Sequence, residues 1–353
     1  MKAAAPPLVA LVASLIVGGF FILLIGKDPL SVYSLLFRET FGYFDGFHFH
    51  PNWFGVGQVI FKATTLVFMG LAVSLAFRAG LFNIGGEGQI YVGAFAMAWV
   101  GFTLKTLPSW LLVPLCLVAG AAGGAFWGVI PGLLKAKRGG NEVINTIMLN
   151  FIAYALVGYL VTGVFAVPAT VHTPEIAAAA RLPRLSGLSP VFTGSLANLS
   201  FLLAILACFA VWYLLWRTST GYELRAGGYN PLAAEYGGIG SAKNAVMAMA
   251  LSGAVAGLGG ANFVMGYKYY FEEGFSFGQG FMGIAVALLG RNHPLGVLLS
   301  AILFAALSEG GFAINLVVPK ELVSILQAII IILVVVTATV FGDWVQRRQK
   351  SNQ

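Results

Sequence analysis

Residues 59–78 read VIFKATTLVFMGLAVSLAFR, and this apolar run is followed at once by the polar, glycine-rich stretch GLFNIGGEGQ at 80–89. A helix needs about 20 largely apolar residues to cross the hydrocarbon of a bilayer. Lipid offers no hydrogen-bond partner, so such a run must form a helix that satisfies its own backbone groups. The two stretches together predict a membrane-spanning helix that ends in a polar break.

The composition of the whole chain points the same way. Of its 353 residues, 59% are apolar and 9% are charged, whereas soluble domains carry about 25% charged residues. This excludes a water-soluble enzyme, and it also excludes a disordered chain, which needs low hydrophobicity and high charge. The net charge of +7 comes from scattered short clusters that form no basic face, so nucleic acid is not an expected partner. We expect an integral membrane protein embedded in a lipid bilayer.

The expected fold is an all-α polytopic membrane protein with about ten transmembrane helices. The expected spans are 8–25, 59–78, 89–104, 111–133, 143–166, 199–216, 244–264, 275–290, 294–313 and 322–341. The third and eighth spans are short and border glycine-rich polar stretches, which predicts helices that are broken or cross only in part.

Basic residues set the expected orientation. An even number of spans places both termini on one side, and the clusters at 135–138 and 347–350 make that side the cytoplasm. The first apolar run lacks a small-residue cleavage site and is expected to be a retained anchor. Residues 1–58 would form an anchor helix and an outer segment, 59–343 the transmembrane domain with a cytoplasmic loop at 217–243, and 344–353 a cytoplasmic tail.

Searches for catalytic and metal-binding motifs are negative. The chain has no P-loop, no His-Glu-x-x-His and no Gly-x-Ser-x-Gly motif. Cys116 and Cys208 lie alone in apolar runs, as buried thiols do. His48 and His50 alternate in an outer segment with no third ligand nearby, which is more typical of a solvated loop than of a metal site. We expect no catalytic residue and no metal ligand.

Polar residues inside the apolar runs are the first candidates for function. Asn83, Glu87 and Gln89 lie in a glycine-rich interruption, and unwound backbone at membrane depth is tolerated where it lines a cavity or is buried in protein. This favours a translocation path. A polar turn between two spans remains the alternative for Glu87, since Arg78 precedes it.

A second polar series follows in the fifth span. Asn141 and Asn145 are four residues apart, and Asn150 lies four after Thr146, so polar side chains recur over more than two helical turns. They would line the path or bond neighbouring helices. The glycine-rich runs 120–124 and 253–260 predict close helix contact instead.

The loop between the sixth and seventh spans carries a local helix signal. Asn230 and Pro231 form an N-cap and first-turn pair, and Gly237 with Gly238 ends the segment. We expect a helix of one or two turns outside the membrane. It would serve either as a docking element for a soluble motor or as a plain amphipathic connector.

Four motifs resemble those of ABC-importer permeases of the branched-chain amino acid and simple-sugar superfamily. The loop matches the superfamily's coupling segment at Gly221, Arg225, Ala226, Gly228, Asn230, Ala233, Ala234, Gly238 and Ile239. The stretches 80–89, 141–150 and 283–292 are similar to signatures of bacterial nucleoside-type permeases that work with basic-membrane-protein-type lipoproteins. The resemblance covers about residues 58–343.

This resemblance implies a type II importer fold in the bacterial inner membrane. The implied partners are a cytoplasmic ABC ATPase, a second permease subunit that is a paralogue, and an external substrate-binding lipoprotein or periplasmic binding protein. The chain itself would bind no cofactor, since ATP and Mg²⁺ belong to the ATPase. The implied ATPase-coupling residues are Gly221, Glu223, Arg225, Asn230, Pro231, Ala233, Ala234, Glu235 and Gly238. The implied pathway residues are Asn83, Glu87, Gln89, Asn141, Asn145 and Asn150.

The sequence is compatible with several substrates and with other classes of membrane protein. An uncharged polar lining suits a nucleoside, but the same fold could import a simple sugar or an autoinducer. An ion-coupled secondary transporter would need intramembrane carboxylates, for which Glu87, Glu142 and Glu309 are the candidates. The hypothesis of an intramembrane enzyme is supported only by isolated histidine and acidic residues, which form no catalytic motif.

Overall fold

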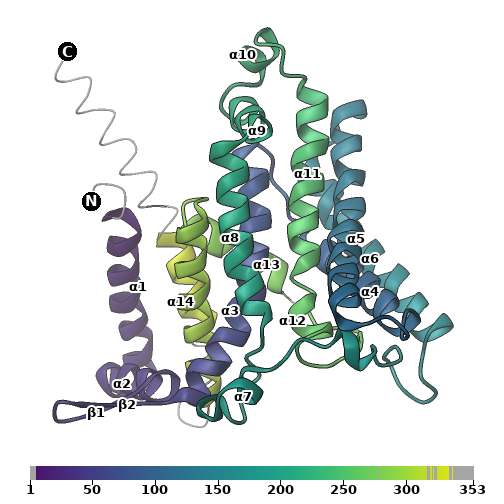
Figure 1. Cartoon of the computed structure of the whole chain (residues 1–353). Coiled ribbons are helices and arrows are strands. Elements are labelled where there is room, and N and C mark those ends of the chain that lie inside the picture. Colours follow the sequence, from purple (N-terminus) through teal and green to yellow (C-terminus); the bar gives the residue numbers. More distant parts are fainter. Residues whose placement is uncertain are drawn as a thin grey trace, which may run out of the picture. The chain divides into compact units, whose positions relative to one another are not determined.

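The computed structural model describes residues 5–276, 278–315, 319, 321, 324–333 and 336, and most of them are helical. The long helices are α1 (Ala5–Leu24), α3 (Trp53–Arg78), α4 (Gly86–Thr103), α5 (Ser109–Arg138), α6 (Glu142–Tyr159), α8 (Ser200–Arg217), α11 (Ser241–Leu258) and α14 (Pro294–Ala313) (Figure 1). The shorter ones are α2 (Pro29–Thr40), α7 (Leu185–Leu188), α9 (Ser219–Tyr229), α10 (Pro231–Tyr236), α12 (Ala261–Val264) and α13 (Gln279–Leu289). Strands β1 (Gly42–Asp45) and β2 (His48–Pro51) form one antiparallel hairpin.

The polytopic helical fold is confirmed. Six of the described helices are long and apolar enough to cross a membrane, and the bent pair α1 and α2 would make a seventh. The six are α3, α5, α6 with its π-helical end, α8, α11 with α12, and α14. The predicted short eighth span is the eleven-residue α13. Within the predicted span 322–341, residues 324–333 form a short apolar helix, and residues 322–323, 334–335 and 337–341 lie outside the described part of the chain.

The chain divides into two compact units, 1–59 with 302–353, and 60–301. In the first unit, Ile22 of α1 and Val32 of α2 form a buried cluster with Ile314 and Leu326. The second unit holds the larger core, in which Tyr91 and Met97 of α4 pack with Cys116 of α5 and Phe271. Both cysteines are buried and free.

Glycines bring the main chains of α5 and α11 into contact, as the runs 120–124 and 253–260 predict. A Cβ atom added at Gly257 would clash with the Gly120 carbonyl oxygen, and one added at Gly124 would clash with that of Gly253. Helix association in lipid depends on such close van der Waals contact, because the hydrophobic effect does not drive it there. Helix α4 joins them through Gly93, which lies against Gly257.

Several elements appear that the sequence did not predict, among them α2 in the outer segment. The expected helix after Asn230 is present as α10, but residues 219–229 are also helical, as α9. Three glycines in that stretch made a loop the simpler expectation. The outer segment contains the β1–β2 hairpin, on which His48 and His50 are exposed. Among the described residues, no group of three metal-binding side chains occurs.

We predict that Gly257→Val destabilises the protein by pushing α5 away from α11. Overpacking of this kind costs about 1–3 kcal/mol, so the thermal unfolding midpoint in detergent should fall. Gly187→Val is the matched control, because an added Cβ at Gly187 meets no atom within 4 Å. An unchanged midpoint for Gly257→Val would contradict the close backbone contact.

Candidate functional site at the break between α3 and α4

The first polar motif forms a non-helical break between α3 and α4. Helix α3 ends at Arg78, and Gly80 then adopts φ +73°, a backbone conformation that favours glycine. The chain is fixed in this turn by the Asn83 side chain, whose Oδ1 accepts a hydrogen bond from the Gly85 N–H at 2.8 Å. Helix α4 begins immediately afterwards, at Gly86.

Asn83 also links the break to α11 and back to α3. Its Nδ2 donates to Gln89 Oε1 at 2.9 Å and to Ser252 Oγ at 2.7 Å. The Ser252 hydroxyl donates in turn to the Ala72 carbonyl at 2.6 Å. Asn83 and Gln89 are each only 1% exposed. These hydrogen bonds give the buried polar groups partners, and leaving such groups without partners would lower the stability of the fold.

Helix α6 supplies the second set of partners. Asn150 accepts a hydrogen bond from the Gly88 N–H at 2.8 Å and donates to the Ile84 carbonyl at 3.0 Å. Thr146 Oγ1 accepts from the Ile84 N–H at 3.3 Å. The side chain of Asn150 therefore replaces helical partners for two backbone groups of the break.

Glu87 lies in the first turn of α4 and is fully buried. One carboxylate oxygen accepts from the Gly280 N–H at 2.8 Å, and the other accepts from Ser276 Oγ at 3.1 Å and Tyr154 OH at 3.3 Å. All three donors are neutral. Glu87 thus ties the start of α4 to the start of α13 and to α6, which is a different environment from a solvated turn.

The structure separates the six predicted pathway residues into two groups. Asn83, Glu87, Gln89 and Asn150 meet in the buried network. Asn141 is instead the N-cap of α6 and accepts from the Val143 N–H at 2.9 Å. Asn145 is partly exposed and lies against Gly140.

The predicted coupling segment is built by α9 and α10. Asn230 caps α10 by accepting from the Ala233 N–H at 3.1 Å, and Gly238, with φ +84°, follows its end. Arg225 donates to the Leu215 carbonyl at 2.9 Å, which fixes α9 against the end of α8. Gly221 packs against the main chain of α8, and Ala234 is buried.

Other residues of this segment are exposed. Leu232 is 72% and Tyr236 96% exposed, and Ala233, Glu235 and the Gly238 turn are exposed as well. Glu223 on α9 is partly exposed. The exposed residues of α10 therefore form the outer surface of the segment, whereas Ala234 and Gly221 are buried beneath it.

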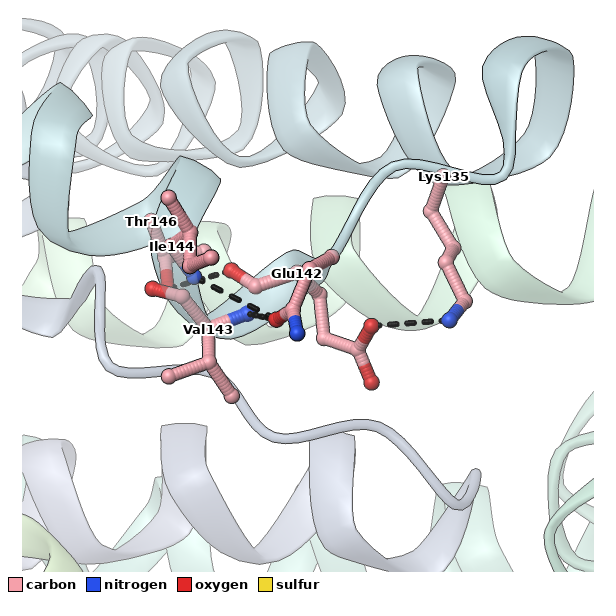
Figure 2. A network of polar contacts seen from close by, with 6 residues as sticks. Lys135, Glu142, Val143, Ile144 and Thr146 are labelled. Atoms are coloured by element: carbon pink, nitrogen blue, oxygen red, sulfur yellow. Dashed lines mark hydrogen bonds and ion pairs between the residues drawn. The ribbon is translucent and has the colours of Figure 1, made fainter.

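A cavity of about 480 Å³ lies beneath this segment and joins the three polar motifs. Its lining includes Gly80 and Leu81 at the start of the break, Lys135 at the end of α5, Glu142 at the start of α6, and Pro231 and Glu235 of α10. An ion pair bridges the wall of the cavity, with Lys135 Nζ 2.9 Å from Glu142 Oε2 (Figure 2). The pair connects α5 to α6 across the turn between them.

Backbone contact links the coupling segment directly to the break. A Cβ atom added at Gly228 of α9 would clash with the Arg78 carbonyl oxygen, and one added at Gly80 would lie 3.1 Å from Gly228 Cα. The main chains of α9 and of the end of α3 are therefore in direct contact.

Arg78 also holds the turn between α13 and α14. Its guanidinium donates to the Asn292 carbonyl at 3.0 Å and to the Arg291 carbonyl at 3.3 Å. Arg291 and Asn292 have φ +55° and +52°, which is uncommon for residues other than glycine. Burial first, and then the nearby Arg78, lower the pKa of His293 in this turn, which favours the neutral imidazole.

Comparison with known proteins identifies the family. Residues 55–335 match the model of the branched-chain amino acid transport system / permease component family. The chain belongs to this family. It is a multi-pass membrane permease, and as such a non-catalytic subunit of an ABC transport system.

Three relatives align with the permease over nearly its whole length. The guanosine ABC transporter permease protein NupP of Bacillus subtilis is 40% identical over 93% of this chain and 92% of its own. The glucose ABC transporter permease protein TsgB13 of Haloferax volcanii is 36% identical, over 93% and 86%. The nucleoside ABC transporter permease protein NupB of Lactococcus lactis is 33% identical, over 94% and 90%. A second B. subtilis guanosine permease protein, NupQ, is 27% identical over 78% and 85%.

Sequence reasoning missed the partners that complete the network. Ser252 lies in an apolar span, and Gly280 contributes only its N–H. Tyr154 follows Asn150 by four residues, which places both on one face of α6. That spacing could have predicted that Tyr154 joins the network. No neighbouring residue in the sequence indicates that Ser252 bonds Asn83.

We predict that Asn83→Ala and Ser252→Ala destabilise the permease non-additively, because each removes a partner of the other. Leaving a buried polar group unpaired costs about 1–3 kcal/mol. The double variant should lose less stability than the sum of the two single variants. Thermal unfolding in detergent measures this cycle, and strictly additive effects would show that the two side chains are not coupled.

Proposed function

We propose that the chain is the membrane-spanning permease subunit of an ATP-driven nucleoside importer. The observation that carries this proposal is the convergence of three polar motifs on one cavity under the α9–α10 segment. Two of the three most similar relatives described above transport guanosine or nucleosides. The buried break is polar, and its side-chain partners are mostly uncharged, which suits a neutral substrate better than an anion.

The proposed mechanism is alternating access driven from the exposed surface of α9 and α10. A cytoplasmic ABC ATPase, which binds ATP and Mg²⁺, would dock on residues 217–243 and move this segment. The Gly228 contact transmits the movement to the end of α3 and hence to the break. The cavity provides room for the displacement, and the Lys135–Glu142 pair keeps α5 and α6 together meanwhile.

The proposed assembly contains two permease chains, two ATPase domains and an external substrate-binding lipoprotein or periplasmic binding protein. The pairing of NupP with NupQ as guanosine permease proteins in one organism supports a paralogue as the second permease. We further propose about ten transmembrane helices, both termini in the cytoplasm and a location in the bacterial inner membrane. The basic clusters at 135–138 and 347–350 support this orientation.

The six pathway candidates would then play three roles. The four buried ones, Asn83, Glu87, Gln89 and Asn150, would position the wall of the path by fixing the break. Asn145 is partly exposed beside the start of α6 and is the better candidate for contact with a passing substrate. Asn141 would act only as a helix cap.

A simple sugar is the second candidate substrate. The observation that favours it is the 36% identity to a glucose permease protein over 93% of the chain. Nothing in the break distinguishes a ribose ring from a hexose.

We predict that the native complex, reconstituted in nanodiscs with its binding protein, hydrolyses ATP faster when a nucleoside is added. The complex should be purified through a tag on this chain from its native operon, and glucose serves as the matched ligand. Stimulation by glucose alone would favour the sugar importer. Purification of the chain alone, with ATP-independent uptake in liposomes, would favour a secondary transporter and overturn the proposal.

We also predict that Leu232→Asp abolishes ATP-driven uptake and reduces co-purification of the ATPase. The new charge would lie on the exposed face of α10, where a partner must desolvate it. Stability of the permease itself should change little, because Leu232 is 72% exposed.

Leu188→Asp is the control for this experiment. Leu188 is 64% exposed on α7, at the end of the second unit opposite α10 (Figure 1). Co-purification of the ATPase should survive this change. Normal uptake and normal ATPase recovery in Leu232→Asp would show that α10 is a connector and not a docking element.

A further inference from the structure

The segment between α1 and α3 carries a surface that the transport mechanism does not use. It consists of α2 and the β1–β2 hairpin, residues 29–51, and lies in the first compact unit. Phe44, Phe47 and Phe49 are 65%, 105% and 43% exposed. Exposed aromatic clusters of this kind on a membrane protein mark a binding surface.

The hairpin has one apolar face. Register pairs Phe44 with Phe49, and their ring centroids are 4.9 Å apart. Phe49 also lies near Phe37 of α2, at 6.5 Å, and Phe37 near Phe41, at 5.4 Å. A continuous aromatic surface therefore runs from α2 along the hairpin, and Phe47 stands at its tip.

The opposite face of the hairpin is polar. Register pairs Tyr43 with His50 and Asp45 with His48, and successive residues of a strand face opposite sides. Tyr43 stacks on His50, with centroids 5.1 Å apart, and the Arg38 guanidinium lies 5.1 Å from the Tyr43 ring. The element is thus amphipathic.

The position of α1 and α2 sets the depth of this surface. Helix α1 has 20 residues without a charged side chain in its described sequence, and about 1.5 Å of rise per residue gives it the length of the hydrocarbon core. Lys27 and Asp28 follow its end, and a span of this length would place them where lipid headgroups begin. Helix α2 is bent by 112° relative to α1 (Figure 1). With α1 upright in the bilayer, α2 would run close to the plane of the membrane.

The base of the hairpin is fixed at the same level. Asn52 donates through its N–H to the Phe41 carbonyl at 2.8 Å and through Nδ2 to the Glu39 carbonyl at 2.6 Å. Its Oδ1 accepts from the Gly55 N–H at 3.1 Å in the first turn of α3. Trp53, at the start of α3, is 44% exposed there, and aromatic side chains favour the membrane–water interface.

We propose that α2 and the hairpin form an interfacial anchor that lies on the lipid surface. The hairpin inserts Phe44, Phe47 and Phe49 between the headgroups and the acyl chains of phospholipids. Its other face keeps Asp45, His48 and His50 in water. The exposed apolar side chains of α1, such as Phe20 and Leu24, continue the same lipid-facing surface.

Site-directed spin labelling of the permease in phospholipid nanodiscs tests this proposal. Both native cysteines are buried, so single labels can be attached through Phe44→Cys, Phe47→Cys, Asp45→Cys and His48→Cys. We expect labels at 44 and 47 to collide preferentially with oxygen, which concentrates in lipid. Labels at 45 and 48 should collide preferentially with a water-soluble nickel chelate.

Two outcomes would overturn the proposal. Equal nickel access at all four positions would place the whole hairpin in water. Nickel access at 44 and 47 that disappears when the binding protein is added would identify a protein docking surface instead. Because all four positions are exposed, the labels should leave the fold intact, and a thermal unfolding midpoint equal to that of the unlabelled protein verifies this.

Discussion

A backbone that leaves the helix inside a bilayer must find hydrogen-bond partners within the protein. The backbone of the break between α3 and α4 finds side-chain partners in Asn83 itself and in Thr146 and Asn150 of α6, and Asn83 and Glu87 extend the network to α11 and α13. Each of them joins two or more elements, so the break cannot form until those elements have come together. The arrangement of the second unit follows from this requirement, because α6, α11 and the start of α13 are all held to one short segment.

Local signals made part of the fold predictable. Asn230 followed by Pro231 predicted α10, and the two glycine runs predicted the close contact of α5 with α11. Such features depend on neighbours in sequence or on a repeated small residue. The α9 helix was not predictable in the same way, because its three glycines weaken helix propensity. Gly221 and Gly228 instead serve its packing against other main chains, and Gly227 packs against the Asn244 side chain.

The candidate site was predictable in its residues but not in its roles. Asn141 and Asn150 look alike in the sequence, yet Asn141 caps α6 and Asn150 bonds the break. The difference arises from partners more than sixty positions away in the chain, such as Ile84 and Gly88. Likewise, nothing local shows that Ala234 is buried while Ala233 beside it is exposed.

The glycine contact between α5 and α11 has a mechanical consequence. Main chains that touch directly have no rotamers with which to absorb a displacement, so neither helix can slide past the other without a collision. Gly93 of α4 takes part in the same contact. We therefore expect α4, α5 and α11 to move together as one rigid body. The turns that connect these helices to α3 and α6 contain Gly80 and Gly139, each with a positive φ that other residues rarely adopt.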